Sequence, residues 1–136
     1  MVIAIPGMDS FKEGLVSLYG ERWLNRGIAV VAIDGPGQYE APMVGIYFST
    51  DKWAAAGPAL LDWLLARSEI DPKRIAVNGT SFGSFFGSIL TANEPRICAC
   101  SVMSVCHEPG DHTIFQEASP PFKKRFMYMS GITEVR

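Results

Sequence analysis

Short apolar stretches alternate with helical segments along this chain, and this alternation restricts the fold more than any other feature. Four stretches, at residues 1–7, 28–34, 75–77 and 96–105, are rich in Val, Ile and Ala. Stretches this apolar are typical of strands that are covered on both faces of a parallel sheet. The order β-α-β-α-β-α-β therefore predicts an α/β fold with a parallel, doubly wound sheet of about four strands.

The first connecting segment, residues 9–27, carries helix signals at both ends. Ser10 and Glu13 have the spacing of a capping box, and Gly27 stands where a helix would end. Apolar residues recur between them at helical spacing. A single helix with marked ends is predicted here.

A second helix is predicted from Lys52 to about Arg67. Asp51 can accept its first N–H groups. Pro58 should bend or restart the helix, because proline lacks the amide hydrogen that a helix interior uses. The buried side of this helix is predicted to consist of Leu60, Leu61, Leu64 and Leu65.

Composition and charge exclude several classes of partner. A chain of 136 residues is about one domain, and 48% hydrophobic with 19% charged residues is typical of a globular protein. The formal charge is −2 and no basic cluster is longer than residues 123–125, so nucleic acid is not an expected partner. No stretch approaches the roughly 20 apolar residues of a membrane span, and residues 1–10 lack the basic start of a signal peptide. We expect a cytoplasmic protein without a membrane partner.

The strongest functional signal is Gly-Thr-Ser-Phe-Gly at residues 79–83, a G-x-S-x-G pattern. The pattern alone is weak, because glycine and serine often meet in turns. Here an apolar strand precedes it and a helix rich in small residues follows, which is the strand-turn-helix setting of a nucleophile elbow. The motif therefore predicts Ser81 as a catalytic nucleophile. The alternative is a serine that only caps the following helix.

A nucleophilic serine needs an oxyanion hole, which is usually built from two backbone N–H groups. The Phe82 N–H directly follows Ser81 and is the first predicted donor. The loop at residues 6–9 follows the first strand, where Gly7 allows a close backbone approach and Met8 supplies the second predicted N–H. Ser81, Phe82, Met8 and Gly7 are therefore the predicted catalytic set.

The spacing of the potential metal ligands does not favour a metal site. Structural zinc sites use paired hooks such as C-x2-C, and this chain does not repeat them. The residues concerned are Cys98, Cys100, Cys106, His107 and His112. We interpret Cys98 and Cys100 as small buried side chains of a strand, and we expect no metal.

A phosphate-binding loop is also disfavoured. Residues 34–40 place two glycines after a strand, but Pro36 lacks an N–H and Glu40 stands where a third glycine is needed. We expect no cofactor. A flavodoxin-like nucleotide or flavin binder is a distant rival, because strand order alone does not exclude it.

Three stretches together resemble the α/β-hydrolase family. "PGMDSFKE", "GIAVVAIDGPGQYE" and "IDPKRIAVNGTSFGS" are similar in order and spacing to its FrsA-like esterase branch, which is similar to enzymes that cleave carbon–carbon bonds beside ketones. The resemblance extends from Val2 to about Val105. It implies a serine hydrolase with Ser81 as nucleophile and Met8 and Phe82 in the oxyanion hole.

The resemblance also implies parts of a hydrolase that these residues do not contain. It implies two strands before the first one seen here, a helical cap after the fourth, and later strands that carry the acid and the histidine. Residues 1–106 would then be part of the hydrolase core and residues 107–136 the start of the cap. Tyr39 departs from the family, whose loop commonly has glycine there.

Few residues of this chain are available as the base or the acid. His107 and His112 are the two histidines, and we expect loop positions for both rather than the role of base. Glu108 follows the fourth strand, where some α/β-hydrolases place their acid, so it is the candidate acid; the alternatives are a carboxylate that binds substrate and one that is simply solvated. Asp111 is the second candidate, and Asp34 is interpreted as a turn-capping carboxylate.

The leading hypothesis is a serine hydrolase that cleaves a small-molecule ester or a carbon–carbon bond beside a ketone. The alternative is a catalytically inactive hydrolase-like module that acts in binding or association. Missing flanking strands would expose sheet edges, so a homo-oligomer formed through a sheet edge or the cap segment is an expected partner.

Overall fold

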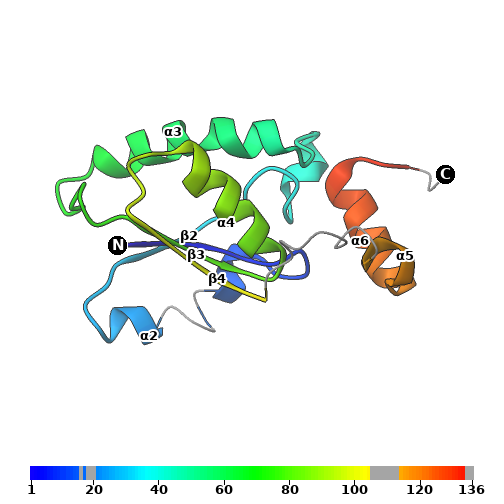
Figure 1. Cartoon of the computed structure of the whole chain (residues 1–136), viewed down its shortest axis with the longest axis horizontal. Coiled ribbons are helices and arrows are strands. Elements are labelled where there is room, and N and C mark those ends of the chain that lie inside the picture. The colour runs from blue at the N-terminus through cyan, green and yellow to red at the C-terminus, as the bar shows by residue number, and fades with distance from the viewer. Residues whose placement is uncertain (16, 18–20, 105–113, 134–136) are drawn as a thin grey trace.

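The computed structural model describes residues 1–15, 17, 21–104 and 114–133. Its four strands form one sheet in which every neighbouring pair is parallel, in the order β2-β1-β3-β4 (Figure 1). The strands are β1 (Val2–Ile5), β2 (Val30–Ala32), β3 (Ala76–Thr80) and β4 (Ala99–Met103). The predicted α/β fold with a parallel sheet is therefore confirmed.

The strand order reverses between β1 and β3. The chain passes from β1 to β2 through α1 (Lys12–Leu15) and α2 (Glu21–Leu24), on one face of the sheet. It then crosses to β3 and β4 through α3 (Thr50–Leu65) and α4 (Phe82–Asn93), on the other face (Figure 1). Such a reversal leaves a crevice outside the carboxyl ends of the two strands. The remaining helices are η2 (Ala41–Val44), α5 (Ile114–Glu117) and α6 (Pro120–Ser130).

The core lies between the sheet and the layer formed by α3 and α4. Trp53 of α3 and Phe86 of α4 are fully buried, and their rings stack with centroids 4.6 Å apart. The Trp53 indole also donates a hydrogen bond to the Pro36 carbonyl at 2.9 Å. A Cβ at Gly35 would lie 2.3 Å from the Trp53 ring, so only glycine fits there. Trp53 thus fixes the loop after β2 against the helical layer.

The signals that begin and shape α3 differ from those predicted. Ser49, rather than Asp51, is the N-cap, because its hydroxyl accepts the Lys52 N–H at 3.2 Å. Asp51 lies in the first turn, where its charge suits the helix dipole. The helix also continues past Pro58 without restarting, because its apolar face is held by tertiary packing. Its buried residues are Trp53, Gly57, Leu61 and Leu64.

The capping box predicted for the first connecting segment is not formed. The Ser10 N–H donates to the Gly7 carbonyl at 3.3 Å, and the Glu13 carboxylate pairs with Lys12. Asp34 caps the segment instead, since it accepts the Lys12 backbone N–H at 2.9 Å. The single helix predicted over this segment is described as two short helices, α1 and α2, with residues 16 and 18–20 outside the described part.

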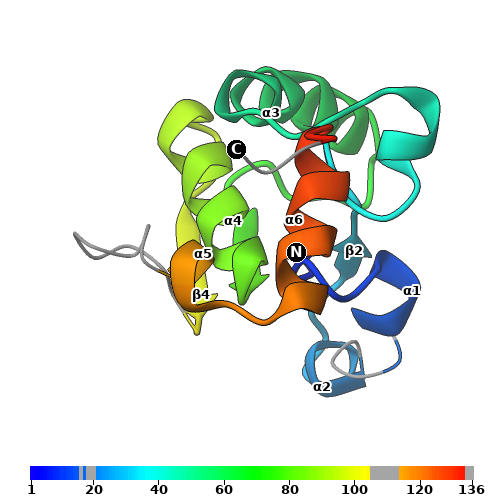
Figure 2. The same cartoon turned by 90° about the vertical axis from the view of Figure 1, so that its right-hand side faces the viewer.

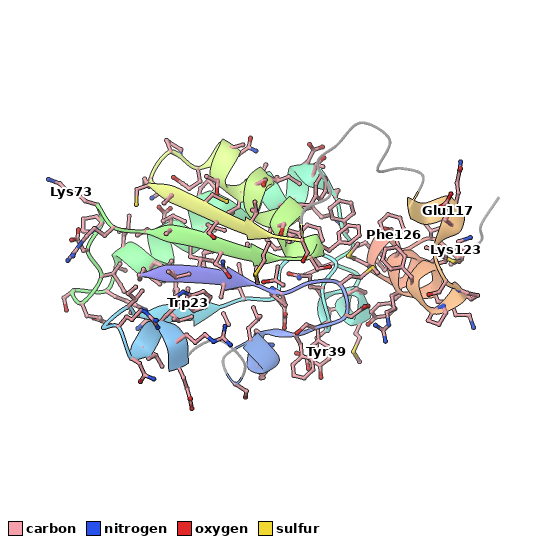
Figure 3. All side chains as sticks on the ribbon, turned by 60° about the horizontal axis from the view of Figure 1, so that its bottom comes forward. Trp23, Tyr39, Lys73, Glu117, Lys123 and Phe126 are labelled. Carbon is pink, nitrogen blue, oxygen red and sulfur yellow. The ribbon has the colours of Figure 1, made fainter. Side chains whose placement is uncertain are left out.

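Strand β4 is exposed along its whole length. All of its residues are exposed, and Cys98 and Cys100 are free, exposed thiols. The prediction that these cysteines are buried was wrong, because β4 is an edge strand and only one of its faces meets α4. In the described part of the chain, Figure 3 shows no helix over the other face of β3 and β4.

No helix among the described residues is long and apolar enough to cross a membrane.

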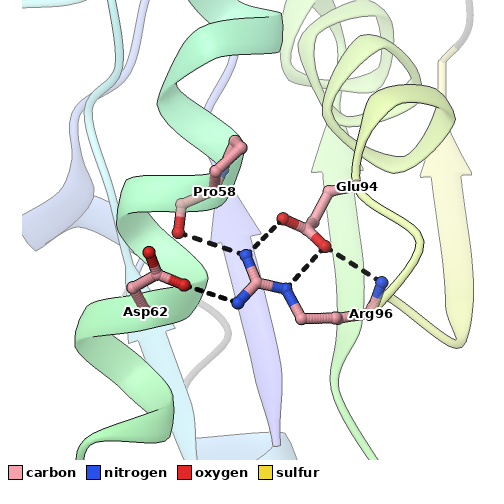
Figure 4. Close-up of polar contacts among 4 residues, drawn as sticks. All are labelled: Pro58, Asp62, Glu94 and Arg96. Carbon is pink, nitrogen blue, oxygen red and sulfur yellow. Dashed lines mark hydrogen bonds and ion pairs between the residues drawn. The ribbon is translucent and has the colours of Figure 1, made fainter.

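One arginine joins the end of α4 to α3 (Figure 4). Arg96 donates to the Glu94 carboxylate at 2.7 and 2.8 Å, to Asp62 at 2.6 Å and to the Pro58 carbonyl at 3.2 Å. The Glu94 side chain is only 3% exposed. Hydrogen bonds from the guanidinium hold the pKa of Glu94 below its ordinary value, against the effect of burial. This carboxylate is therefore both buried and fully paired.

The lowered pKa of Glu94 predicts a pH-dependent stability. Its contribution is fully present above the ordinary value of 4.5 and is lost as the pH falls through the lower folded-state pKa. We expect Glu94→Gln to lower Tm by roughly 4 °C at pH 7 and to have a smaller effect below pH 4. Thermal unfolding followed by circular dichroism at both pH values checks this. Glu69→Gln, an exposed control, should leave Tm unchanged, and an effect of Glu94→Gln that is equal at both pH values would contradict the prediction.

Candidate active site

Ser81 stands between the end of β3 and the start of α4, at the carboxyl edge of the sheet. Its backbone has φ 55° and ψ −127°, a conformation that residues with a Cβ rarely adopt. Its side chain is exposed. Strain of this kind is typical of functional sites. The strand-turn-helix arrangement predicted around the G-x-S-x-G pattern is present.

The two glycines of the pattern are required by close backbone contacts. A Cβ at Gly79 would lie 2.2 Å from the Gly83 carbonyl oxygen. A Cβ at Gly83 would lie 2.2 Å from the Ile5 carbonyl oxygen. Because these neighbours are backbone atoms, a side chain at either position would push α4 away from β1 and β3.

Ser84, in the first turn of α4, ties the elbow to the end of β4. Its hydroxyl is fully buried, accepts the Met103 N–H at 3.1 Å, and lies within donating distance of two carbonyls, those of Met103 at 2.7 Å and Gly79 at 3.1 Å. The Ser81 N–H donates to the same Met103 carbonyl at 2.8 Å. The sequence analysis missed Ser84, because a small residue in a helix does not reveal which strand end it faces.

The loop after β1 lies against Ser81, as the sequence predicts. A Cβ built on Gly7 would lie 3.0 Å from the Ser81 Cβ and 3.4 Å from its Oγ. Met8 follows and packs partly against the core. The structure therefore brings Gly7, Met8, Ser81 and Phe82 together at the ends of β1 and β3.

Gln38 holds this loop in place, and the sequence analysis did not single it out. The side chain is buried, and its amide donates to the Pro6 carbonyl at 2.7 Å. Its oxygen accepts the Gly35 N–H at 2.9 Å. The loops after β1 and β2 are thus joined by one side chain. A glutamine in a turn-rich stretch carries no sequence signal for this contact.

Helix α6 lies beyond the carboxyl ends of the strands (Figures 1 and 2). The Phe122 and Phe126 ring centroids lie 6.4 and 6.0 Å from that of Phe82, the residue after the serine. Helix α6 therefore covers one side of the elbow.

A cleft of about 390 Å³ opens beside Met8. It lies between the loop after β1, the loop after β2 and α6. Its apolar walls include Met8, Phe11, Tyr39, Met43, Tyr128 and Met129. Met8 of the cleft wall follows Gly7, which lies so close to Ser81 that an added Cβ would be 3.0 Å from the serine Cβ. A cavity of similar size, lined by Met1, Gly27 and Cys98, lies at the opposite, amino end of the strands.

Asp34 has a structural role in this geometry. Its side chain is only 8% exposed, and burial raises the pKa of its carboxyl despite the opposing effect of Lys12. The Lys12 ammonium donates to Asp34 at 3.1 Å and pairs with Glu13 at 3.1 Å, and these carboxylates raise the pKa of Lys12. Asp34 therefore caps α1, in agreement with its interpretation as a capping carboxylate.

The predicted acid and the histidines are not part of the described structure. Glu108, Asp111, His107 and His112 all lie within residues 105–113, outside the described residues, as does Cys106. Their roles stay predictions. Among the described residues, no group of three His, Cys, Asp or Glu side chains could hold a metal ion.

Comparison with curated proteins finds fungal hydrolases. The chain is 36% identical over 104 residues to Hydrolase ffsE of Aspergillus flavipes, covering 69% of this chain and 23% of that protein. It is 30% identical over 134 residues to Hydrolase ORFZ of Pyricularia oryzae, covering 90% and 30% respectively. It is 34% identical over 112 residues to the alpha/beta hydrolase xenA of Xenoacremonium sinensis, covering 74% and 25%. The chain thus spans only about a quarter of the length of such relatives, and no family model matches it.

Solved structures agree with this result. A 2,6-dihydroxy-pseudo-oxynicotine hydrolase superposes with a TM-score of 0.81 at 27% identity, covering 98% of this chain and 36% of that one. A putative acetyl xylan esterase from Bacteroides fragilis superposes with a TM-score of 0.56 at 21% identity, covering 73% and 35%, and bears on the fold alone. The chain therefore has an α/β-hydrolase fold, of which its four parallel strands form a part, and its relatives are α/β hydrolases.

Proposed function

We propose that this chain forms part of a serine hydrolase that cleaves an ester or a carbon–carbon bond beside a ketone. The observation that carries the proposal is the strained, exposed Ser81 at the end of β3 with the Gly7 loop against it. The similarity to hydrolases supports the reaction class. A small-molecule substrate and a cytoplasmic location belong to the same proposal.

In the proposed reaction the Ser81 Oγ attacks the substrate carbonyl carbon, and negative charge develops on the carbonyl oxygen. The N–H groups of Phe82 and Met8 would bind that oxygen. Phe82 is the first residue of α4, so its N–H lies at the helix N-terminus beside Ser81, where the helix dipole favours developing negative charge. The Ser81 N–H donates to Met103 and is therefore not a donor to the substrate.

The reaction also needs a base to accept the Ser81 proton and return it to the leaving group. In an ester the leaving group is an alkoxide. In the cleavage of a carbon–carbon bond beside a ketone it is a carbanion, which takes up the proton as it leaves and is an enolate where that carbon carries a second carbonyl group. Water then hydrolyses the acyl-serine in the second half of the reaction. A histidine is the proposed base and Glu108 the proposed acid, by the resemblance described above.

Strand β4 favours a second function, association between copies of the chain. All of its residues are exposed, and its outer edge has no partner strand among the described residues. Such edges are templates for pairing with another chain.

Labelling with a fluorophosphonate probe tests the nucleophile. We expect a single adduct by intact mass, and none with Ser81→Ala, because only a serine whose hydroxyl is activated reacts readily. Ser101→Ala, which removes an exposed hydroxyl from β4, is the matched control and should keep the adduct. An adduct that persists in Ser81→Ala would contradict the assignment of Ser81 as the nucleophile. Absence of any adduct on the unmodified chain would favour the alternative, a hydrolase-like module that is catalytically inactive.

The role of Ser84 in holding the elbow predicts a loss of reactivity. Ser84→Ala leaves the Met103 N–H without its partner, which should cost about 1–3 kcal/mol of folding free energy. It should also slow the labelling of Ser81 at least about tenfold at a temperature well below Tm, since the strained backbone can relax. Thr91→Ala removes a hydroxyl bonded to Gly87 further along α4, and it should leave the labelling rate unchanged. Equal rates for the two variants would show that Ser84 is merely structural.

Sedimentation velocity tests the association of β4 edges. We expect a dimer or larger species at high concentration, and Val102→Lys should shift the population toward the monomer because it places a charge on the exposed edge. If both the unmodified chain and the Val102→Lys variant sediment only as monomers, association through β4 is excluded.

A further inference from the structure

Tyr39, in the loop after β2, is held in a strained conformation at the cleft. Its φ is 42°, which is uncommon for a bulky side chain and which glycine would adopt without strain. The residue is 48% exposed and lines the cleft beside Met8. Strained residues persist only where the surroundings fix them, and they gather at ligand sites.

Contacts from two other parts of the chain fix Tyr39. The Tyr128 hydroxyl of α6 donates to the Tyr39 carbonyl at 3.1 Å. The Tyr39 ring stacks on Phe11, with centroids 5.1 Å apart and planes 27° apart, and the Lys12 ammonium lies 5.7 Å from its centroid. Figure 3 shows Tyr39 at the same end of the molecule as Phe126 of α6, away from Lys73. The ring is therefore a wall of defined position.

The chemistry of the cleft favours a neutral, flat group. Its charged lining residues, Asp9 and Arg125, form an ion pair with each other. The hydroxyl of Tyr128 is already engaged by the Tyr39 carbonyl. Methionines and aromatic rings make up most of the remaining wall, and both make favourable contacts with aromatic ligands.

The position of the cleft connects it to the proposed nucleophile. Met8 belongs to the cleft wall, and the preceding Gly7 touches Ser81. A volume of about 390 Å³ falls in the range of small-molecule sites, roughly 300–1,000 Å³. Met8, the proposed second oxyanion donor, lines the cleft and Ser81 does not, so the inference takes this space as the place of a group that adjoins a carbonyl held at Ser81.

We propose that Tyr39 is a specificity-determining residue, the wall against which a neutral aromatic group of the substrate stacks. The inference rests on the proposed function, because it takes the cleft as the site of the group beside the scissile carbonyl. Saturated rings of the same size bind less well, since they cannot stack on the Tyr39 face. The Tyr128 hydroxyl links the position of this wall to α6.

Binding of two ketones tests the inference. The probes are 4-phenyl-2-butanone and 4-cyclohexyl-2-butanone, titrated into the full chain by saturation-transfer NMR. We expect the phenyl ketone to bind about fivefold tighter, a ratio typical of one aromatic pair. Hydrophobicity alone would favour the cyclohexyl ketone, so the sign of the preference is informative.

Variants assign the preference to Tyr39. Tyr39→Gly accepts the backbone conformation without strain, so the chain should stay folded while the ratio falls below about twofold. Tyr39→Phe keeps the ring and should keep the ratio. Met43→Ala, at an exposed part of the cleft wall, is the control and should weaken both ketones equally. Equal binding of the two ketones by the unmodified chain, or an unchanged ratio in Tyr39→Gly, overturns the inference.

The two proposals fail in different ways. The ketone ratio does not require Ser81 to react, and fluorophosphonate labelling does not require the cleft to be filled by a ring. A phenyl preference that depends on Tyr39, with an unreactive Ser81, supports the cleft assignment and contradicts the hydrolase. A reactive Ser81 with no phenyl preference supports the hydrolase and overturns the role of Tyr39.

Discussion

The close approach of α4 to the ends of β1 and β3 is the constraint on which the rest of the site depends. At Gly79 and Gly83 the backbones pack so tightly that a single added carbon would lie 2.2 Å from a carbonyl oxygen. This contact turns the chain sharply at Ser81 and leaves its side chain exposed. It also brings Gly7 against the serine. The positions of both loops that border the serine therefore depend on the absence of a side chain at Gly79 and at Gly83.

The architecture could be predicted from the sequence because its signals are local. Apolar runs predicted the four strands, and the glycines of the G-x-S-x-G pattern predicted the sharp turn at Ser81. Both signals consist of residues that are close to one another along the chain. The cap of α1 was predicted wrongly for the opposite reason. Asp34 reaches α1 from another segment. Likewise, α3 runs through Pro58 because Trp53 and Leu61 pack on the core.

The parts of the site that the sequence did not reveal are side chains that join distant backbones. Gln38 joins the loops after β1 and β2, and Ser84 joins α4 to Met103 of β4. The sequence around Gln38 looks like an ordinary turn and the sequence around Ser84 like an ordinary helix, so neither contact could be predicted. Buried polar side chains of this kind are recognised only when their partners are known, because the hydrogen bonds satisfy backbone groups far away in the chain.

Helix α6 connects the two sides of the proposed site. Phe126 packs beside Phe82, whose N–H is the proposed oxyanion donor, and Tyr128 bonds the backbone of Tyr39 at the cleft wall. Phe126 and Tyr128 belong to one short helix, so they move together. A displacement of α6 would therefore change the surroundings of the oxyanion hole and the shape of the cleft at once. Because Tyr39 is strained, the Tyr128 hydrogen bond also supplies part of the energy that keeps the wall in place.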